Sequence, residues 1–221
     1  MPIGEGKRIG LFGGTFDPVH AGHLAIASLA AQELALEQVL FIPAADPPHK
    51  QKPGASYGHR VALLEAALAQ GADEQGRFAI SLLEAELSAP SYTVDTLLEL
   101  KKRLTGQFYF IIGADSLLEL HYWYGYQKLL FLTNFIVISR PGIPIPAMHQ
   151  AITNLPGPFL ADSRQKHWFR ADGAQIILLN NTLHEDISST LIRQQLRAGE
   201  YTASLNSSVR EYIDQYGLYT S

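Results

Sequence analysis

The sequence predicts one α/β domain built on a doubly wound parallel sheet. Short apolar segments with the length of strands alternate with helical segments along most of the chain, as in sheets that carry helices on both faces. The first strand is followed by a glycine turn, a helix and a second strand, which is the beginning of a right-handed crossover. With 221 residues, of which 47% are apolar, the chain is long enough to bury the core of a single domain.

In the first half of the chain, strands are expected where short apolar runs stand between turn residues. They cover residues 8–12, 38–42, 78–83 and 108–112. Helices are expected over residues 22–36, 58–70 and 93–104, because each stretch has the composition or the apolar spacing of a helix. Residues 43–57 are rich in Pro, Lys and Gly and are expected to form a loop.

The second half is expected to contain further strands over 135–139 and 175–179. Helices are expected over 122–132, 188–197 and 207–216, so residues 186–221 form a C-terminal helical segment of the same domain. Between them, residues 140–175 carry many Pro and Gly residues and are expected to be loop-rich. A short helix near 147–153 is the alternative for part of that segment.

Composition excludes several classes of protein. The net charge of −4 makes a general nucleic-acid binder a poor candidate. The chain has no cysteine, which rules out thiol catalysis, disulfides and thiolate metal sites. No run approaches the roughly 18 apolar residues of a membrane span, and the first residues lack the apolar run of a signal peptide. We therefore expect a soluble cytoplasmic protein without membrane or nucleic-acid partners, and the sequence leaves its oligomeric state open, a homo-oligomer included.

The first motif with chemical content is GGTFDPVHAGHL at residues 13–24, directly after the first strand. Gly13 and Gly14 allow a sharp turn and a close approach of the main chain to a ligand. His20 and His23 are three residues apart at a helix entrance, where free N–H groups and the helix dipole favour anions. The motif predicts an anion site with two imidazoles beside it; the alternative is an ordinary turn with a capping histidine. Asp17 precedes a proline and is expected to shape the turn rather than to act in catalysis.

The second motif is ISSTLIR at residues 187–193. Ser188 or Ser189 can cap the following helix, and Arg193 lies one turn inside it. Hydroxyls, helix N–H groups and a guanidinium on one face suit a triphosphate. The alternative is a plain helix cap with a solvated arginine.

Together these two motifs resemble the H-x-G-H and I-S-S-T-x-x-R signatures of the nucleotidylyltransferase superfamily, and most closely those of bacterial nicotinate-nucleotide adenylyltransferases. Further landmarks of that family occur in its order, namely PPHK at 47–50, SYTVDTL at 91–97, IGADSL at 112–117, WY at 123–124, RPG at 140–142 and YGLY at 216–219. The resemblance runs nearly end to end and is weakest over residues 143–175. It implies a Rossmann-like fold of the nucleotidyltransferase type.

The resemblance also implies roles for individual residues. It makes His20, His23 and Arg193 the catalytic residues, which contact the phosphates of ATP. The implied ATP-binding residues are Gly13, Gly14, Thr15, Phe16, Gly113, Asp115, Ser188, Ser189 and Thr190. On the acceptor side, His49 and Lys50 match the basic pair near the mononucleotide phosphate. Trp123, with Tyr124 beside it, matches the aromatic that stacks on the pyridine ring, and Thr93 lies where the ring carboxylate is held.

Three of these residues have structural alternatives. Lys50 could be merely solvated in its loop, Trp123 could belong to the core, and Asp115 could only cap the segment that follows the strand at 108–112.

The implied reaction transfers AMP from ATP to nicotinate mononucleotide and releases pyrophosphate. Mg²⁺ would accompany ATP, held by phosphates and water, so no protein metal site is expected. Within the superfamily, the alternatives are a pantetheine-phosphate adenylyltransferase or a cytidylyltransferase. Outside it, the alternatives are a nucleotide sensor without activity and a histidine metal site, for which a third ligand is missing from the sequence pattern.

Overall fold

The computed structural model describes residues 6–47, 52–69, 75–180, 187–200 and 202–220. Its strands are β1 (Arg8–Gly14), β2 (Gln38–Pro43), β3 (Phe78–Ile80), β4 (Gln107–Gly113), β5 (Asn134–Ile138), β6 (Leu160–Ala161), β7 (His167–Phe169) and β8 (Gln175–Leu179). Its α-helices are α1 (Ala21–Glu33), α2 (Tyr57–Ala69), α3 (Thr93–Arg103), α4 (Ala114–Glu119), α5 (Tyr126–Leu132), α6 (Ile145–Thr153), α7 (Ser189–Arg197) and α8 (Ser207–Tyr216). Two 3₁₀ turns cover Leu83–Glu86 and Leu120–Tyr122.

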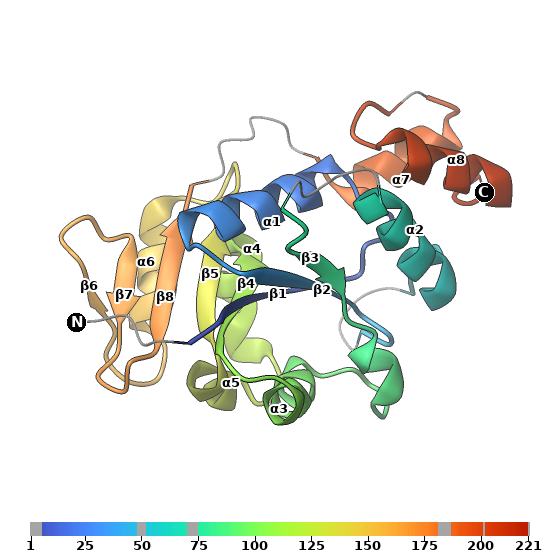
Figure 1. Ribbon diagram of the computed structural model, residues 1–221. Helices are drawn as coiled ribbons and strands as arrows, with labels where there is room; N and C mark the ends of the chain where they lie inside the picture. The colour runs from blue at the N-terminus through green and yellow to red at the C-terminus, as the bar shows by residue number, and fades with distance from the viewer. Residues whose placement is uncertain (1–5, 48–51, 70–74, 181–186, 201, 221) are drawn as a thin grey trace.

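The strands form one sheet in the order β3-β2-β1-β4-β5-β8-β7-β6 (Figure 1). The six strands from β3 to β8 are parallel, and β7 and β6 extend the sheet in the antiparallel sense. The chain therefore starts in the middle of the sheet and winds outward in both directions. The predicted fold class, a doubly wound parallel sheet in a single α/β domain, is confirmed. In such sheets, ligands bind outside the carboxyl ends of the strands, where the winding changes direction.

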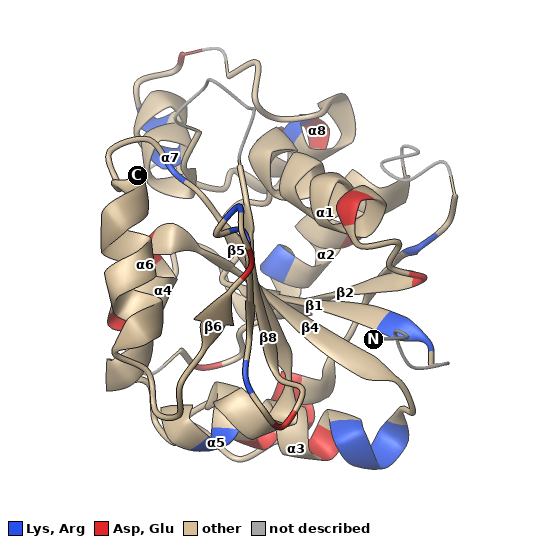
Figure 2. Ribbon diagram, turned by 90° about the vertical axis from the view of Figure 1, so that its left-hand side faces the viewer, with Lys and Arg blue, Asp and Glu red and all other residues tan. Residues whose placement is uncertain are grey.

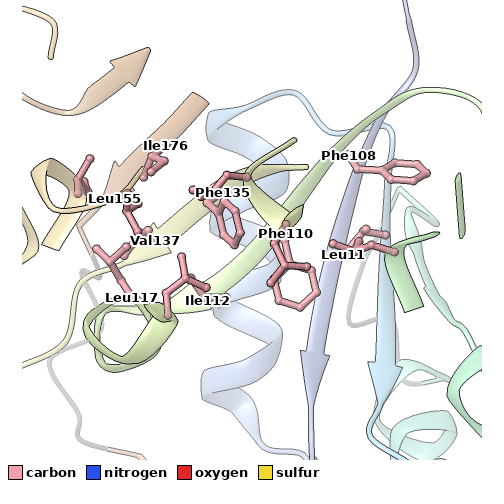
Figure 3. Packing of buried hydrophobic residues seen from close by; sticks show 14 of the residues in the cluster. Leu11, Phe108, Phe110, Ile112, Leu117, Phe135, Val137, Leu155 and Ile176 are labelled. Carbon is pink, nitrogen blue, oxygen red and sulfur yellow. The ribbon is translucent and has the colours of Figure 1, made fainter. Parts of the chain in front are cut away.

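Alternate residues of the strands point to the two faces of the sheet, and each face has its own core. In β4, Phe110 and Ile112 face one side, where α3, α4, α5 and α6 pack (Figure 3). Tyr109 and Ile111 face the other side, which α1 and α2 cover; α8 packs on α2, and residues of α7 and α8 extend this core beyond them (Figure 1). Because β4 is buried on both faces, it is apolar without alternation, as central parallel strands are.

Two differences from the sequence-based expectation affect the site. The expected strand at 78–83 ends at Ile80, and a 3₁₀ turn follows that directs Glu84 into the protein. The helix expected over 122–132 begins only at Tyr126, because Gly125 takes a left-handed conformation with φ of 65°. Trp123 and Tyr124 therefore lie in the connection before α5, not inside a helix.

The segment 140–175 is more regular than a loop-rich stretch. It contains α6, which begins two residues before the helix considered at 147–153, and the antiparallel pair β6 and β7. Strands of two and three residues are too short to show an apolar period. In the described part of the chain, no helix is long and apolar enough to cross a membrane.

Candidate active site

A cleft of about 930 Å³ opens at the carboxyl ends of the parallel strands. Its walls come from the end of β1 and the loop after it, the start of α1, the β4–α4 junction, the start of α3, the 3₁₀ turn at Glu84 and the N-terminal half of α7. Nearly all the described residues singled out from the sequence line this one cleft. His49 and Lys50 lie outside the described residues.

The glycine turn expected at residues 13–14 is wrong: Gly13 and Gly14 are the last residues of β1 and pair with Ile42 and Pro43 of β2. This strand end and the loop that follows it are closely packed. A Cβ added to Gly13 would lie 3.1 Å from the ring of Phe110, and one added to Gly14 would lie 3.0 Å from the ring of Phe16. Phe16 itself is buried and takes a left-handed φ of 51°. The two glycines are therefore needed to keep the main chain close to the neighbouring strand and to the cleft.

His20 and His23 form a ring pair at the start of α1. Their ring centroids are 3.7 Å apart at an interplanar angle of 32°, and the main-chain N–H of His20 donates to Nδ1 of His23. His23 also packs edge-on against Phe16 at 5.0 Å. Burial, reinforced by the charge of Arg140, lowers the pKa of His20 to about 4, so His20 is neutral near pH 7. A neutral imidazole can donate or accept a hydrogen bond without adding a charge.

The start of α7 lies against the β1–α1 loop, although the two segments are about 170 residues apart. Ser188 caps α7 by accepting from the N–H of Leu191, as predicted for one of the two serines. Ser189 instead donates its hydroxyl to the carbonyl of Pro18 at 3.0 Å. Arg193 is not solvated: its side chain is 24% exposed, and it donates to the carbonyl of Asp17 at 2.7 Å. The two motifs therefore build one continuous part of the cleft wall, and Figure 2 shows the basic residues on α7.

Asp115 lies in the first turn of α4 and pairs with Arg140, which follows β5, at 3.5 Å. Both side chains are about half exposed and line the cleft. A Cβ at Gly113 would collide with the carboxylate of Asp115 and lie 3.1 Å from Nε of Arg140. The sequence analysis named Arg140 as a landmark and gave it no role. A basic residue that follows a central parallel strand lies at the edge of the sheet where ligands bind, so its position could have indicated a cleft residue.

A further part of the cleft wall is formed by the start of α3 and the connection before α5. Thr93 is the first residue of α3, and Ser91 and Tyr92 precede it. Trp123 is half-buried, with its ring edge-to-face with Phe110 at 6.3 Å, and it packs on the core while lining the cleft. Tyr124 is 61% exposed and lies 4.4 Å from the ring of Tyr92. Trp123 therefore has one part packed on the core and another part facing the cleft, where it is free to contact a ligand.

Glu84 is a buried residue of the cleft that the sequence reasoning missed. Its carboxylate accepts from the hydroxyl of Thr96 at 3.0 Å and from the N–H of Ala45 at 3.3 Å. Burial raises the pKa of Glu84. Glu84 thus joins α3 to the loop that follows β2. Nothing in the local sequence separates Glu84 from Glu86, which is exposed.

Arg60 of α2 is a second residue that the sequence did not indicate. It is 1% exposed, and its guanidinium donates at 2.7 Å to the carbonyls of Thr15 and Ala44. These carbonyls follow the last residues of β1 and β2. Arg60 therefore holds the two strand ends that border the cleft.

Among the residues that the structure describes, no group of three or more His, Cys, Asp or Glu side chains is arranged to hold a metal ion. The histidine pair of α1 has no third ligand there. Imidazoles, hydroxyls, helix N–H groups and a guanidinium together are suited to polyphosphate binding.

Comparison with known proteins places this fold and cleft in a class. The family model described as Cytidylyltransferase-like matches residues 11–195, which span the stretch from β1 into α7. The chain is thus a nucleotidyltransferase of the cytidylyltransferase-like class. Two proteins named "Probable nicotinate-nucleotide adenylyltransferase", from Gloeobacter violaceus and Stenotrophomonas maltophilia, are each 39% identical to it. The alignments cover 97% of this chain and 97% of the first relative, and 95% and 96% for the second. The chain belongs to the nicotinate-nucleotide adenylyltransferase family.

The fold is also similar to that of a solved structure. The Plasmodium falciparum nicotinic acid mononucleotide adenylyltransferase complexed with NaAD superposes with a TM-score of 0.76 at 19% identity. The match covers 96% of this chain and 97% of that one.

Proposed function

We propose that this protein transfers AMP from ATP to nicotinate mononucleotide, giving nicotinate adenine dinucleotide and pyrophosphate. The observation that carries the proposal is the arrangement of one cleft. The histidine pair and Arg193 line it near the end of β1, and Trp123 and the start of α3 also line it. Polyphosphate-binding groups and a site for an aromatic ring thus share one cavity, as joining two nucleotides requires.

The part of the cleft beside the end of β1 is proposed to take ATP. Gly13 and Gly14 supply the strand end, Thr15 and Phe16 the loop after it, and Ser188, Ser189 and Thr190 the N-terminus of α7. His20 and His23 would contact the α-phosphate, and Arg193 the phosphates that leave as pyrophosphate. Gly113 and Asp115 would lie at the adenosine. The N–H groups of the helix start and the guanidinium of Arg193 would stabilise the negative charge of the ATP phosphates.

The α3 end is proposed to take the mononucleotide. Free N–H groups at the start of α3 and the helix dipole favour the ring carboxylate near Thr93. The flat surface of Trp123, with Tyr124 beside it, is suited to stacking on the pyridine ring. His49 and Lys50 are proposed for the mononucleotide phosphate from sequence alone, since the structure does not describe them.

The reaction needs no nucleophile from the protein. An anionic phosphate oxygen of the mononucleotide attacks the α-phosphorus of ATP in line, and the bond from that phosphorus to the bridging oxygen of the β-phosphate breaks. Pyrophosphate leaves with the electron pair. The protein positions two polyanions and stabilises charge on the oxygens in the transition state. ATP is proposed to enter as its Mg²⁺ complex, with the ion held by phosphate oxygens and water.

A direct assay tests this proposal. Purified protein with ATP and Mg²⁺ is offered nicotinate mononucleotide, nicotinamide mononucleotide or phosphopantetheine, and pyrophosphate release is recorded; CTP replaces ATP in a parallel series. We expect release with ATP and nicotinate mononucleotide above all other pairs. Faster turnover of phosphopantetheine or CTP would assign a different member of the superfamily. Nucleotide binding without pyrophosphate from any pair would make the protein a sensor.

A further inference from the structure

The guanidinium of Arg193 is oriented by the protein itself. Its Nη1 donates to the main-chain carbonyl of Asp17 at 2.7 Å, and its Nη2 lies 3.4 Å from the hydroxyl of Thr190. The carboxylate of Asp17 is 3.6 Å from the same Nη1. The direction in which Arg193 offers its remaining N–H groups to a ligand therefore depends on where Asp17 lies.

Asp17 is in turn held by two other parts of the chain. It is 4% exposed, and its Oδ2 and Oδ1 accept from the main-chain N–H groups of Gly54 and Ala55 at 2.7 and 3.0 Å. Its Oδ1 also accepts from the hydroxyl of Tyr219 at 2.7 Å. One carboxylate thus connects the β1–α1 loop with the loop before α2 and with the segment that follows α8.

The Tyr219 contact is buried and specific. Tyr219 is 6% exposed and takes a left-handed φ of 64°, two residues after the left-handed Gly217 that ends α8. Burial and the adjacent Asp17 carboxylate raise the pKa of its phenol, so the hydroxyl stays protonated and donates. A Cβ added to Gly54 would lie 3.3 Å from the ring of Tyr219 and 3.4 Å from the side chain of Arg193. The ring, the glycine loop and Arg193 therefore pack together in one place.

We propose that Asp17 and Tyr219 are positioning residues for Arg193. The hydroxyl of Tyr219 fixes the Asp17 carboxylate, and the Asp17 main chain then aims the guanidinium at the leaving phosphates. This inference rests on the proposed role of Arg193 at the triphosphate. It gives the segment after α8, which does not line the cleft, an effect on the departure of pyrophosphate.

A double-mutant cycle tests the proposal, because it measures coupling separately from the role of either residue. The variants are Tyr219→Phe, Arg193→Ala and the combination. Tyr219→Phe removes only the hydroxyl, so we expect a loss of kcat of about 2- to 10-fold, the size of one ordinary hydrogen bond, because the hydroxyl acts on Arg193 only through Asp17. The KM for the mononucleotide should stay within about twofold, since the start of α3 and Trp123 are not part of this network. In the Arg193→Ala background, Tyr219→Phe should change kcat by less than about twofold.

A matched control and a second variant complete the experiment. Tyr212 of α8 also offers a hydroxyl to a neighbour, Nδ1 of His59 at 3.1 Å, but neither residue lines the cleft. Tyr212→Phe should leave kcat unchanged. Asp17→Asn keeps the shape of the side chain but removes its charge. Like Tyr219→Phe, it should lower kcat in the wild-type background and have little effect on kcat in the Arg193→Ala background.

The outcomes separate the two proposals. Equal loss of kcat from Tyr219→Phe in both backgrounds, or no loss in either, would overturn the positioning role. Full activity of Arg193→Ala would instead remove the proposed role of Arg193 at the triphosphate, and the positioning proposal with it. Melting temperatures of all variants show whether a loss of kcat comes from unfolding. If Tyr219→Phe melts early, the Asp17→Asn series decides whether this network positions Arg193.

Discussion

The imidazole rings of His20 and His23 lie against each other with their centroids 3.7 Å apart, across the first turn of α1. Two imidazolium ions at this separation would repel each other strongly, since little water lies between them. The pair avoids this because burial lowers the pKa of His20 to about 4. The site thus presents a neutral ring and a second ring beside it to the incoming phosphates.

The low pKa of His20 predicts a pH dependence of stability. The unfolded chain binds a proton at His20 near the ordinary value of 6.5, and the folded chain only near 4. Above 6.5 neither state binds it, so the contribution of His20 to stability is fully present there and is lost as the pH falls from 6.5 towards 4. In His20→Asn, the free energy of unfolding, measured in urea, should fall less between pH 7 and pH 5 than in the wild type. Identical pH profiles would contradict the buried, neutral state of His20.

Loss of His23 or Arg193 should mainly affect turnover. Each is proposed to stabilise charge in the transition state, and removal of one such group lowers kcat by about 10²-fold or more. We expect this loss in His23→Ala and in Arg193→Ala, with far-ultraviolet circular dichroism unchanged. His167→Ala is the control, since His167 is exposed on β7, away from the cleft. A near-normal kcat in either site variant means that the residue has no catalytic role.

The start of α3 predicts a preference for the acid acceptor over the amide. Three residues at this helix start, Ser91, Tyr92 and Thr93, line the cleft, and free N–H groups with a helix dipole favour a carboxylate. We expect kcat/KM for nicotinate mononucleotide to exceed that for nicotinamide mononucleotide by about 10- to 1000-fold. The measurement is kcat/KM for both acceptors at fixed ATP, and equal values would contradict this role of α3.

Trp123 predicts a selective effect on the acceptor. Stacking on a ring is worth about 1–3 kcal/mol when the aromatic is removed, so Trp123→Ala should raise the acceptor KM by about 5- to 150-fold. The KM for ATP should be nearly unchanged, and Trp123→Phe should lie in between. The control is Trp168→Ala: Trp168 is 6% exposed and does not line the cleft, so its loss should lower the melting temperature without a selective effect on the acceptor. If Trp123→Ala weakens both substrates and melts as early as the control, Trp123 is a core residue and Tyr124 becomes the candidate for stacking.

The buried carboxylate of Glu84 is expected to contribute to the free energy of unfolding. Glu84→Ala leaves the N–H of Ala45 without its acceptor and the hydroxyl of Thr96 with only the more distant carbonyl of Tyr92, which costs about 1–3 kcal/mol of unfolding free energy. Glu84→Gln keeps an acceptor oxygen and should cost less. Glu86→Gln is the control, because its pair with Arg103 is exposed and contributes little. If Glu86→Gln lowers the free energy of unfolding as much as Glu84→Ala does, burial of Glu84 is not the reason for its effect on stability.

Sequence reasoning predicted the parts of the site that are local in the chain. The histidine spacing and the Ser188 cap are short-range patterns, and the alternation of strands and helices is sufficient to predict the sheet. The turn expected at Gly13 and Gly14 was wrong, because these residues still pair with β2 as the end of β1. Sequence reasoning missed Glu84 and Arg60, because their importance comes from partners distant in sequence, such as Thr15, 45 residues from Arg60. The expected strand end at Leu83 and helix start at Tyr122 were wrong for a related reason. A 3₁₀ turn and a left-handed Gly125 interrupt apolar stretches whose composition continues unchanged.

The two carbonyls held by Arg60 have a consequence for how the cleft stays open. Beyond the pair of Gly14 and Pro43 the regular ladder between β1 and β2 ends, and one main-chain bond remains, from the N–H of Ala44 to the carbonyl of Gly14 at 2.9 Å. A planar guanidinium bonded to one carbonyl on each side acts as a spacer of fixed width. Since arginine keeps its charge at every physiological pH, this spacer does not depend on acidity. The protein's own contacts therefore set the width of the cleft mouth on this side.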